Sequence, residues 1–465
     1  MMRKPHILFI FTDDQRFDTI HALGNPEIHT PNMDWLVERG TAFTHAHIPS
    51  GTCAAVCMPS RAMLHTGRTL FHIENEGQNI PSEHITMGEA FRQAGYRTFG
   101  TGKWHNGANS YARSFTDGGS IFFGGMWDHW NVPICDFDPE GRYDRTIPFT
   151  GNFSLNNKIT RVHCDRIHPG NHSTDLIAGE AVNFLERYQE KDPYLMYVSF
   201  LAPHDPRTMP EEFLKMYDPE NITLPGNFAP EHPFDYGVRE IRDELLASYP
   251  RTEEGVRRHI AEYYAMITHL DHAIGTILQK VKDRGELDQT IVVLAGDNGL
   301  AVGQHGLFGK QSLYEHSVRV PLLFSGPGIP RGLQLSNYAY LLDIYPTLCG
   351  LAGIPIPDSV EGLDLHFMMK DPSLELRKTL YFAYGGCIRG VKDRKYKLIE
   401  YAGKYHGIQL FDLEQDPLET CSLVEHSEFA PVIKALREEL CRYRDAWDEL
   451  AHPIGRNFIG IQPDY

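Results

Sequence analysis

The sequence lacks any apolar run long enough to cross a bilayer. A membrane-spanning helix needs about 20 consecutive, mostly apolar residues, whereas the apolar stretch from His6 to Phe11 passes directly into Thr12-Asp13-Asp14. Because no cleavage site follows this stretch, it predicts a first β-strand and not a signal peptide. As the sequence stands, we expect a cytoplasmic protein without a membrane partner, or a periplasmic or secreted one whose signal peptide has been removed.

Basic side chains are scarce relative to acidic ones. The 465 residues include 44 Lys and Arg against 61 Asp and Glu, which gives a formal net charge of −17. This charge repels nucleic acid and anionic membranes, so we expect neither as a partner. An anionic substrate must therefore be held by a local positive pocket, and a small substrate is repelled less than a long polyanion.

Closely spaced cysteines are also scarce. Of the eight cysteines only Cys53 and Cys57 lie near each other, and no second pair completes a zinc site. We expect the other six to be small buried side chains. Neither a zinc site nor a disulfide framework is therefore indicated.

Strand and helix patterns alternate along most of the chain. Apolar runs at Ile7–Phe11, Tyr194–Leu201 and Thr290–Ala295 predict strands that are buried on both faces. Capping residues Thr30 and Thr86 open two helices. Further elements are predicted at 96–100 (strand), 174–188 (helix) and 254–284 (helix). The alternation predicts an α/β fold with a mostly parallel central sheet sandwiched by helices.

After about residue 365 the pattern changes. Leu380–Ala383, Tyr396–Tyr401 and Ile408–Phe411 predict short antiparallel strands, followed by a helix at about 429–448. We therefore predict two units, which are a catalytic α/β domain (1–365) and a smaller C-terminal α+β subdomain with an antiparallel sheet (366–465).

Two segments interrupt the alternation within the first unit. Residues 106–170 are rich in glycine, aromatic residues and histidine, and residues 203–250 are rich in proline. We expect both to be long excursions over the edge of the site, where such loops often carry specificity.

Polar clusters follow four of the predicted strands. They are Asp13-Asp14, Lys103 with His105, His204, and Asp297-Asn298. Because ligands of open α/β sheets bind at the carboxyl ends of the strands, we expect these clusters to meet. Three carboxylates and one amide oxygen suit a hard divalent cation, Ca²⁺ or Mg²⁺. Either acidic pair alone would equally suit a turn or a helix cap.

The run Cys57-Met58-Pro59-Ser60-Arg61 is the most informative segment. It places a thiol at the start of a short helical stretch, with an arginine one turn further on and Gly67-Arg68 at its end. This predicts an anion site with a nucleophile built into it. Gly309-Lys310, in a glycine-containing loop, offers a further cation.

These motifs resemble those of the type I, formylglycine-dependent sulfatases of the alkaline phosphatase superfamily. The matching segments are Thr12-Asp13-Asp14-Gln15, Cys57–Arg61 with Thr66-Gly67-Arg68, Gly102-Lys103-Trp104-His105, Gly296-Asp297-Asn298-Gly299 and Gly306–Lys310. They occur in the family's order over roughly residues 5–420, and Asn106 stands where leucine is frequent. The resemblance implies an alkaline-phosphatase-like fold and a sulfuric ester hydrolase similar to bacterial carbohydrate sulfatases.

The resemblance also implies the chemistry. Cys57 would be oxidised by a formylglycine-generating maturation enzyme, and the hydrated aldehyde would take up sulfate and expel it through its second hydroxyl. Ca²⁺, with Mg²⁺ as an alternative, would be held by Asp13, Asp14, Asp297, Asn298 and residue 57. The other implied roles are orientation of residue 57 by Arg61, sulfate binding by Lys103 and Lys310, protonation of the leaving alcohol by His204, and proton removal by His105.

The expected substrate is a small anionic sulfate ester, and a sulfated saccharide is the class we predict. Long loops with aromatic and polar side chains can build a pocket beside Lys103, His204 and Lys310, and the candidate residues are Trp127, Asp128, His129, Trp130 and Arg207. Core packing explains the two tryptophans equally well. Two other functions stay open, a phosphonate monoester or phosphodiester hydrolase with the same site, and a non-catalytic anion-binding protein.

Overall fold

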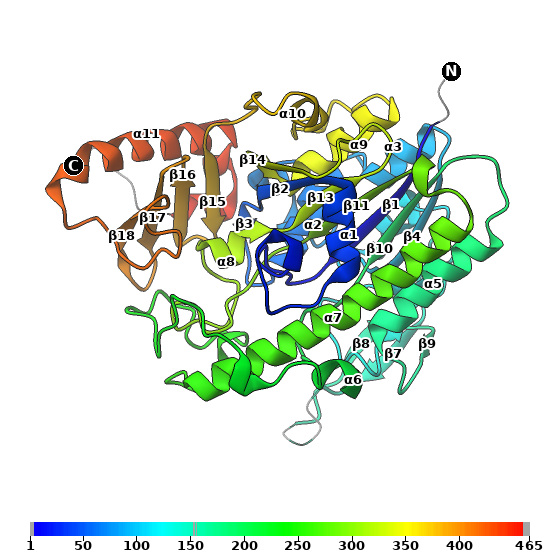
Figure 1. Ribbon diagram of the computed structural model, residues 1–465, viewed down its shortest axis with the longest axis horizontal. Coiled ribbons are helices and arrows are strands. Elements are labelled where there is room, and N and C mark those ends of the chain that lie inside the picture. Colours follow the sequence, from blue (N-terminus) through cyan, green and yellow to red (C-terminus); the bar gives the residue numbers. More distant parts are fainter. Residues whose placement is uncertain (1–3, 152–153, 155, 459–465) are drawn as a thin grey trace.

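The computed structural model describes residues 4–151, 154 and 156–458. Its centre is a nine-stranded mixed sheet in the order β12-β2-β13-β11-β1-β10-β4-β5, with β14 paired to β2 (Figure 1). The strands are β1 (His6–Thr12), β2 (Gly40–His47), β4 (Arg97–Lys103), β5 (Asp117–Phe122), β10 (Tyr194–Ser199), β11 (Thr290–Gly296), β12 (Arg319–Val320), β13 (Leu322–Ser325) and β14 (Leu333–Tyr340).

Strand β1 shows why the apolar runs are continuous. All of its residues are buried, and its side chains alternate between two cores, with Ile7 and Phe9 in one and Leu8 and Ile10 in the other. It pairs in parallel with β10 and with β11. A strand in this position has no solvated face, so the five residues between its polar ends, Ile7–Phe11, are all apolar.

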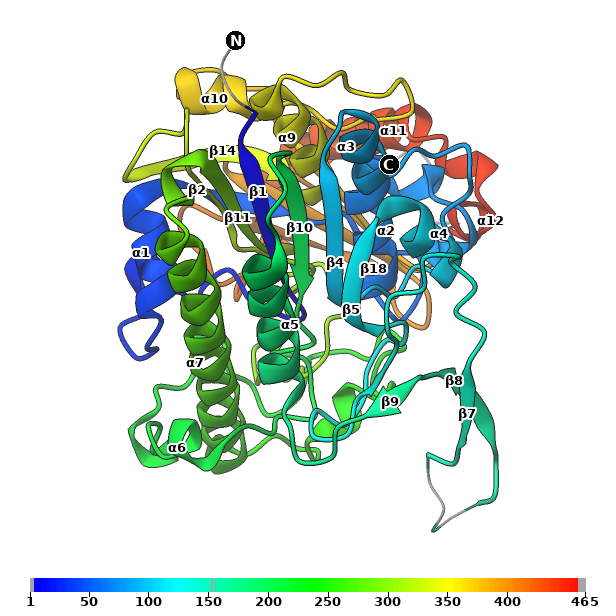
Figure 2. The same ribbon diagram turned by 90° about the vertical axis from the view of Figure 1, so that its right-hand side faces the viewer.

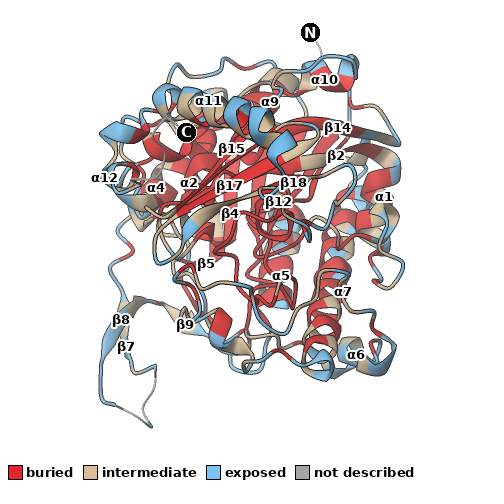
Figure 3. Ribbon diagram, turned by 90° about the vertical axis from the view of Figure 1, so that its left-hand side faces the viewer, coloured by how far each residue is buried: buried red, intermediate tan, exposed pale blue. Residues whose placement is uncertain are grey.

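Helices cover both faces of the sheet (Figures 2 and 3). Residues of α2, α3 and α9 pack on one face, and residues of α1, α5 and α7 pack on the other. The helices are α1 (Pro31–Arg39), α2 (Cys57–Thr66), α3 (Met87–Gln93), α4 (Ala108–Ser114), α5 (Ser173–Arg187), α6 (Glu211–Leu214), α7 (Glu253–Asp283), α8 (Glu315–Val318), α9 (Ile344–Ala352), α10 (His366–Lys370), α11 (Ala430–Ala446) and α12 (Pro453–Arg456). The predicted α/β architecture is confirmed.

A second, five-stranded sheet lies beside the first, under α11 (Figure 1). Its strands are β18 (His406–Asp412), β17 (Tyr396–Ala402), β16 (Ile388–Lys392), β15 (Leu380–Tyr384) and β3 (Ser50–Gly51). The four C-terminal strands are antiparallel, as predicted, whereas β3 comes from the segment just before Cys57 and pairs in parallel with β15. The C-terminal sheet therefore contacts the segment that leads into α2, and the boundary near residue 365 stays a prediction.

The two predicted excursions differ in the structure. Segment 106–170 contains β5, which pairs with β4 in the central sheet, so the prediction of one long excursion is wrong there. The rest of this segment forms α4 and the short paired strands β6 (Pro133–Ile134), β9 (Arg166–Ile167), β7 (Thr146–Phe149) and β8 (Thr160–His163). The β7–β8 pair projects from the body of the protein (Figure 2).

Segment 203–250 contains one short α-helix, α6, and otherwise runs as loop and 3₁₀ turns. Within the part of the chain that is described, no helix combines the length and the apolar content that crossing a bilayer requires.

Candidate active site

The carboxyl ends of β1, β4, β10 and β11 lie at one edge of the central sheet, and α2 begins there. Hydrogen bonds and ion pairs connect the side chains at this edge into one cluster. Its members are Asp13, Asp14, Cys57, Arg61, Lys103, His105, His204, Asp297, Asn298 and Lys310. The structure thus brings together all ten residues for which the sequence predicted a metal or catalytic role.

Arg61 is the centre of this cluster and is fully buried. Its Nε donates to Asp297 Oδ2 at 2.9 Å, and its Nη2 lies 3.5 Å from Asp13 Oδ2. Its Nη1 donates to Lys103 O at 3.1 Å and to Ser199 Oγ at 2.7 Å. One guanidinium therefore ties the ends of four strands together and offsets two buried carboxylates.

Cys57 lies between a lysine and a histidine. Its Sγ is 3.6 Å from Lys103 Nζ and 3.5 Å from His105 Nδ1. Lys103 also contacts Asp13. Burial raises the pKa of the Cys57 thiol, although the positive charges of Lys103 and Lys310 act to lower it. An unmodified thiol at this position therefore stays protonated at neutral pH and is a weak nucleophile.

The other side of the cluster surrounds Asp14. Its Oδ1 accepts hydrogen bonds from Lys310 Nζ and from Asn298 Nδ2, each at 2.6 Å. His204 Nε2 lies 3.7 Å from its Oδ2. Asp14 and His105 both have left-handed backbones, with φ of 63° and 69°, a conformation that is uncommon for residues other than glycine and concentrates at functional sites.

Two oxygen atoms of the cluster have no hydrogen-bond partner among the residues that the structure describes. They are Asp13 Oδ1 and Asn298 Oδ1, and both are buried. One ligand atom each from Asp13, Cys57 and Asp297 lies within 4.8 Å of the others. Buried oxygens without a partner are costly unless something satisfies them, so this donor set fits a hard divalent cation.

The charges of the two central carboxylates are coupled. Burial, and then the neighbouring Asp13 carboxylate, raise the pKa of Asp297. Burial also disfavours charge on Asp13, but Lys103 and Arg61 hold its pKa well below the ordinary value. Burial and the charge of Lys103 keep the pKa of His105 well below its ordinary value, so this ring is neutral and able to accept a proton.

Asn106 holds the first turn of α2 in place. Its side chain is buried, and Nδ2 donates to Met58 O at 3.0 Å and to Gly77 O at 2.6 Å. A leucine here could make neither bond. The departure from the family pattern therefore has a structural consequence that the sequence did not reveal.

Glu244 fixes the loop that carries Lys310. It is buried and accepts the backbone N–H groups of Phe308 and Gly309. Its Oε2 also accepts from Arg251 Nη2 at 2.6 Å. The proline-rich segment 203–250 therefore packs against the site. This agrees with the prediction that the segment runs over the edge of the site.

Lys103, His204 and Lys310, which were also predicted to bind substrate, belong to the cluster, whereas the predicted pocket residues Trp127, Asp128 and Arg207 lie outside it. Trp127 packs on Phe149 at 4.3 Å between ring centroids, and Asp128 accepts hydrogen bonds within its own turn. Arg207 lies 3.0 Å from His259 Nδ1. In the described residues no hydrogen bond or ion pair connects Trp127, Asp128 or Arg207 to the ten residues, and their substrate role stays a prediction.

His129 requires a correction. It is buried, its Nδ1 lies 2.7 Å from Ser173 Oγ, and its Nε2 lies 2.9 Å from His204 O. Because both ring nitrogens are engaged, neither can bind a substrate. His129 instead fastens the backbone of His204 to the start of α5.

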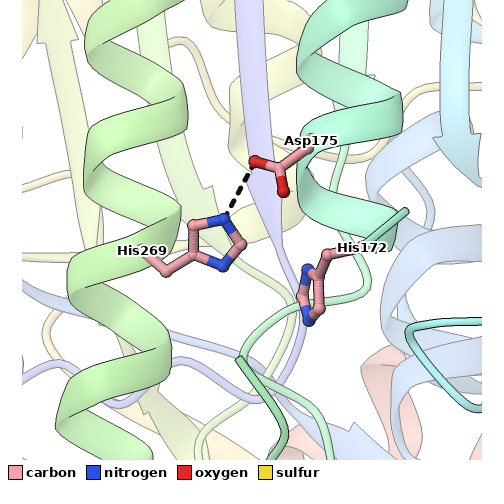
Figure 4. A group of neighbouring side chains, drawn as sticks. All are labelled: His172, Asp175 and His269. Atoms are coloured by element: carbon pink, nitrogen blue, oxygen red, sulfur yellow. Dashed lines mark hydrogen bonds and ion pairs between the residues drawn. The ribbon is translucent and has the colours of Figure 1, made fainter. Parts of the chain in front are cut away.

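A second group of possible metal ligands lies nearby and consists of His172, Asp175 and His269 (Figure 4). His172 Nδ1 accepts from Thr174 N and caps α5, while its Nε2 lies 2.9 Å from Thr208 O. His269 Nε2 is 2.9 Å from Asp175 Oδ1. Since both nitrogens of His172 are already used, this group serves to fasten the 204–208 segment to α5.

Comparison with known proteins decides the family. The model of the sulfatase family matches residues 5–354, well over half of the chain. The chain belongs to the sulfatase family. A second model, for the C-terminal part of N-sulphoglucosamine sulphohydrolase, matches residues 303–446 of this sulfatase. It is therefore a sulfuric ester hydrolase, from a family that is generally formylglycine-dependent and metal-binding.

Curated relatives agree with this assignment. The ulvan-active sulfatase of Formosa agariphila is 30% identical over 453 residues, which cover 94% of this chain and 80% of the relative. The arylsulfatase of Clostridium perfringens is 28% identical, with 96% of this sulfatase and 95% of the relative covered.

Solved structures share the fold. One, in complex with its substrate D-glucosamine-2-N,6-O-disulfate, gives a TM-score of 0.77 at 21% identity and covers 97% of this chain and 99% of that one. The phosphonate monoester hydrolase of Agrobacterium radiobacter gives 0.75 at 23% identity, with 96% of each chain covered. Both confirm the alkaline-phosphatase-like α/β fold.

Several residues that support the site were missed in the sequence. Ser199 bonds Arg61, and its position at the end of β10 was the one available signal. Asn106 directly follows the Gly102–His105 motif and was noted only as a departure from the family pattern, and Glu244 lies in a segment without a motif, so only the fold shows what they contact.

Proposed function

We propose that this sulfatase releases inorganic sulfate from a sulfated saccharide, using formylglycine at position 57 and a bound Ca²⁺ ion. The observation that carries the proposal is the gathering of Asp13 and Asp297 around Cys57, together with the buried oxygens of Asp13 and Asn298 that lack partners within the described residues. The saccharide is supported by relatives, which include an N-acetylglucosamine-6-O-sulfatase of Bacteroides thetaiotaomicron at 24% identity, and by the neighbour solved with a sulfated glucosamine.

The cation would be held by Asp13, Asp14, Asp297 and Asn298, with residue 57 as a further ligand. When bound, the ion supplies positive charge that stabilises an oxyanion at residue 57 and on the sulfate. Ca²⁺ fits this site because all the protein donors are hard oxygens. Mg²⁺ prefers the same donor type and is the alternative cation.

Conversion of Cys57 to formylglycine is supported by the state of the thiol. Since burial keeps the sulfhydryl protonated, an unmodified cysteine would contribute little. Once hydrated, formylglycine supplies one hydroxyl as the nucleophile and a second whose deprotonation releases sulfate. A formylglycine-generating maturation enzyme is therefore a required partner.

Lysine and histidine side chains supply the charge and proton transfers. Lys103 Nζ, 3.6 Å from Cys57 Sγ, and Lys310 Nζ, bonded to Asp14, flank the place where sulfate oxygens would lie. His105 Nδ1, 3.5 Å from the same sulfur, is placed to take a proton from residue 57.

His204 is placed to protonate the leaving alcohol. Its Nδ1 lies 2.7 Å from Asp205 O, and because a carbonyl can only accept, this nitrogen carries a proton. Nε2 is then free to hold a second proton and to donate it. Asp14 Oδ2 lies 3.7 Å from Nε2.

The test is sulfate release by protein that has been coexpressed with a formylglycine-generating enzyme. We expect turnover of sulfated monosaccharides and of 4-nitrophenyl sulfate, and none with Cys57→Ala, whose folding is checked by circular dichroism. A clear preference for a phosphonate monoester or phosphodiester over the sulfates would favour the alternative hydrolase. Turnover by Cys57→Ala would show that the nucleophile is misassigned.

A further inference from the structure

Segment 203–250 carries an arginine held between two carboxylates. Arg242 contacts Asp205, and its Nη1 donates to Asp243 Oδ1 at 3.1 Å. Arg242 and Asp243 are adjacent in the sequence, whereas Asp205 lies 37 positions before Arg242, so the chain folds back to form the group. Sequence alone gave no sign that these residues meet.

The group contacts the catalytic residues on both sides. Asp205 Oδ1 lies 3.5 Å from His204 Nδ1. Asp243 Oδ2 accepts from Gln311 Nε2 at 2.7 Å, and Gln311 Oε1 accepts the backbone N–H of Lys310. The group therefore spans the two residues that flank the place of the reaction.

Side-chain exposure rises from the site outward through this group. It is 4% for Lys310 and 8% for His204, then 5% for Asp205, 16% for Asp243 and 43% for Arg242. Arg242 and Asp243 are thus the members that solvent, and a substrate entering from solvent, reach first.

The direction of the reaction places the leaving alcohol next to them. His204 donates its proton to the oxygen that joins sulfate to the alcohol, so the alcohol extends on the His204 side of the sulfur. This step rests on the proposed function. Beyond His204, Arg242 forms an ion pair with Asp205, the residue that follows His204, and a second ion pair with Asp243.

The charge of the group is uneven. Burial acts to raise the pKa of both carboxyl groups, but His204 and Arg242 beside Asp205, and Lys310 beside Asp243, outweigh it and lower both pKa values. Within the group itself, two carboxylates face one guanidinium. Carboxylates accept hydrogen bonds from hydroxyl and ammonium groups and repel other anions. The net charge of this group therefore opposes a second sulfate or a carboxylate on the alcohol.

We propose that Arg242 and Asp243 determine which leaving alcohol the enzyme accepts, favouring alcohols that carry hydroxyl or ammonium groups over those that carry a second anion. Asp243 supplies the acceptor and the negative charge. Arg242 moderates that charge and holds the two carboxylates in place. Neutral and amino sugars with one sulfate are the substrates that this arrangement suits.

The experiment compares two aryl sulfates, 4-(aminomethyl)phenyl sulfate and 4-carboxyphenyl sulfate, on the matured enzyme. The measured quantity is the ratio of kcat/KM for the ammonium probe to that for the carboxylate probe, in each variant relative to the wild type. We expect Asp243→Asn to lower this ratio about fivefold and Arg242→Gln to raise it about fivefold, because each removes one partly exposed charge. Arg239→Gln is the matched control, since Arg239 lies on the same segment and pairs with Glu231.

The two variants are expected to change the kcat/KM ratio in opposite directions. A folding defect cannot produce this result, because it lowers kcat/KM for both probes alike. Ratios that stay at the wild-type value in both variants, or that move in the same direction, would overturn the inference while leaving the sulfatase activity intact. If the matured wild-type enzyme turned over neither probe nor 4-nitrophenyl sulfate, that result would overturn the proposed function and the inference with it.

Discussion

Replacing Arg61 by methionine should destabilise the protein strongly in the absence of divalent cation. Arg61 and both of its carboxylate partners, Asp13 and Asp297, are completely buried. Methionine keeps the unbranched stem but removes the charge and every donor. Asp13 and Asp297 then face each other with one positive charge fewer between them.

The size of the effect follows from the geometry. At the 2.9 Å separation of Arg61 Nε and Asp297 Oδ2, the Coulomb attraction is about 6 kcal/mol for an effective dielectric constant of about 20. The desolvation of the guanidinium, which methionine avoids, offsets part of this. Breaking a buried ion pair by removing one partner typically costs about 3–5 kcal/mol, and we predict a loss of that size.

The assay is equilibrium unfolding in guanidinium chloride, followed by tryptophan fluorescence, with a chelator present. The matched control is Arg68→Met, because Arg68 ends the same helical segment but is 19% exposed and lies 3.4 Å from Glu361. That variant should lose about 1 kcal/mol or less. Equal losses for the two variants would refute the role given to Arg61, and saturating Ca²⁺ should reduce the loss in Arg61→Met.

Three further substitutions probe the surroundings of the site. Burial lowers the pKa of His65 to about 3, so below pH 6.5 the unfolded state binds a proton that the folded state does not, and stability falls as the pH drops. His65→Phe should therefore reduce the slope of the unfolding free energy between pH 5 and 4 by about 1.4 kcal/mol per pH unit in denaturant titrations, and an unchanged slope would contradict this. Asn106→Leu removes the side-chain donor to the Met58 and Gly77 carbonyls, the second of which is buried, and should cost about 1–3 kcal/mol in the same assay, with no loss counting against the bonds described. His129→Ala frees the carbonyl of His204 and should lower kcat about tenfold or more for alkyl sulfates. It should affect 4-nitrophenyl sulfate less, because that leaving group needs little protonation, and equal losses on both substrates would argue against a role through His204.

The sequence predicted the elements in which a single physical requirement, such as burial on both faces or helix capping, determines the residue types. Strands β1, β10 and β11 are buried on both faces, so their apolar runs are unbroken. The capping box at Thr86 is present as predicted. The four polar clusters could be expected to meet because parallel strands end at the same edge.

Other strands gave no such pattern. β2 carries threonine and histidine residues that are buried between antiparallel partners and the parallel β14, and β16 contains Arg389 and Lys392, which are paired inside the protein. The partners of β2 lie more than 200 residues away in the chain, and those of Arg389 and Lys392 lie 60 and 77 residues away. Contacts of this kind, like those of His129 and Asn106, exist only once the whole fold has formed.

Removal of divalent cation tests the central claim most directly. Release of inorganic sulfate by the matured enzyme should stop after treatment with a chelator and return on addition of Ca²⁺, because the buried oxygens of Asp13 and Asn298 then regain their partner. Undiminished sulfate release in the presence of chelator, from protein shown to be free of metal, would contradict the account.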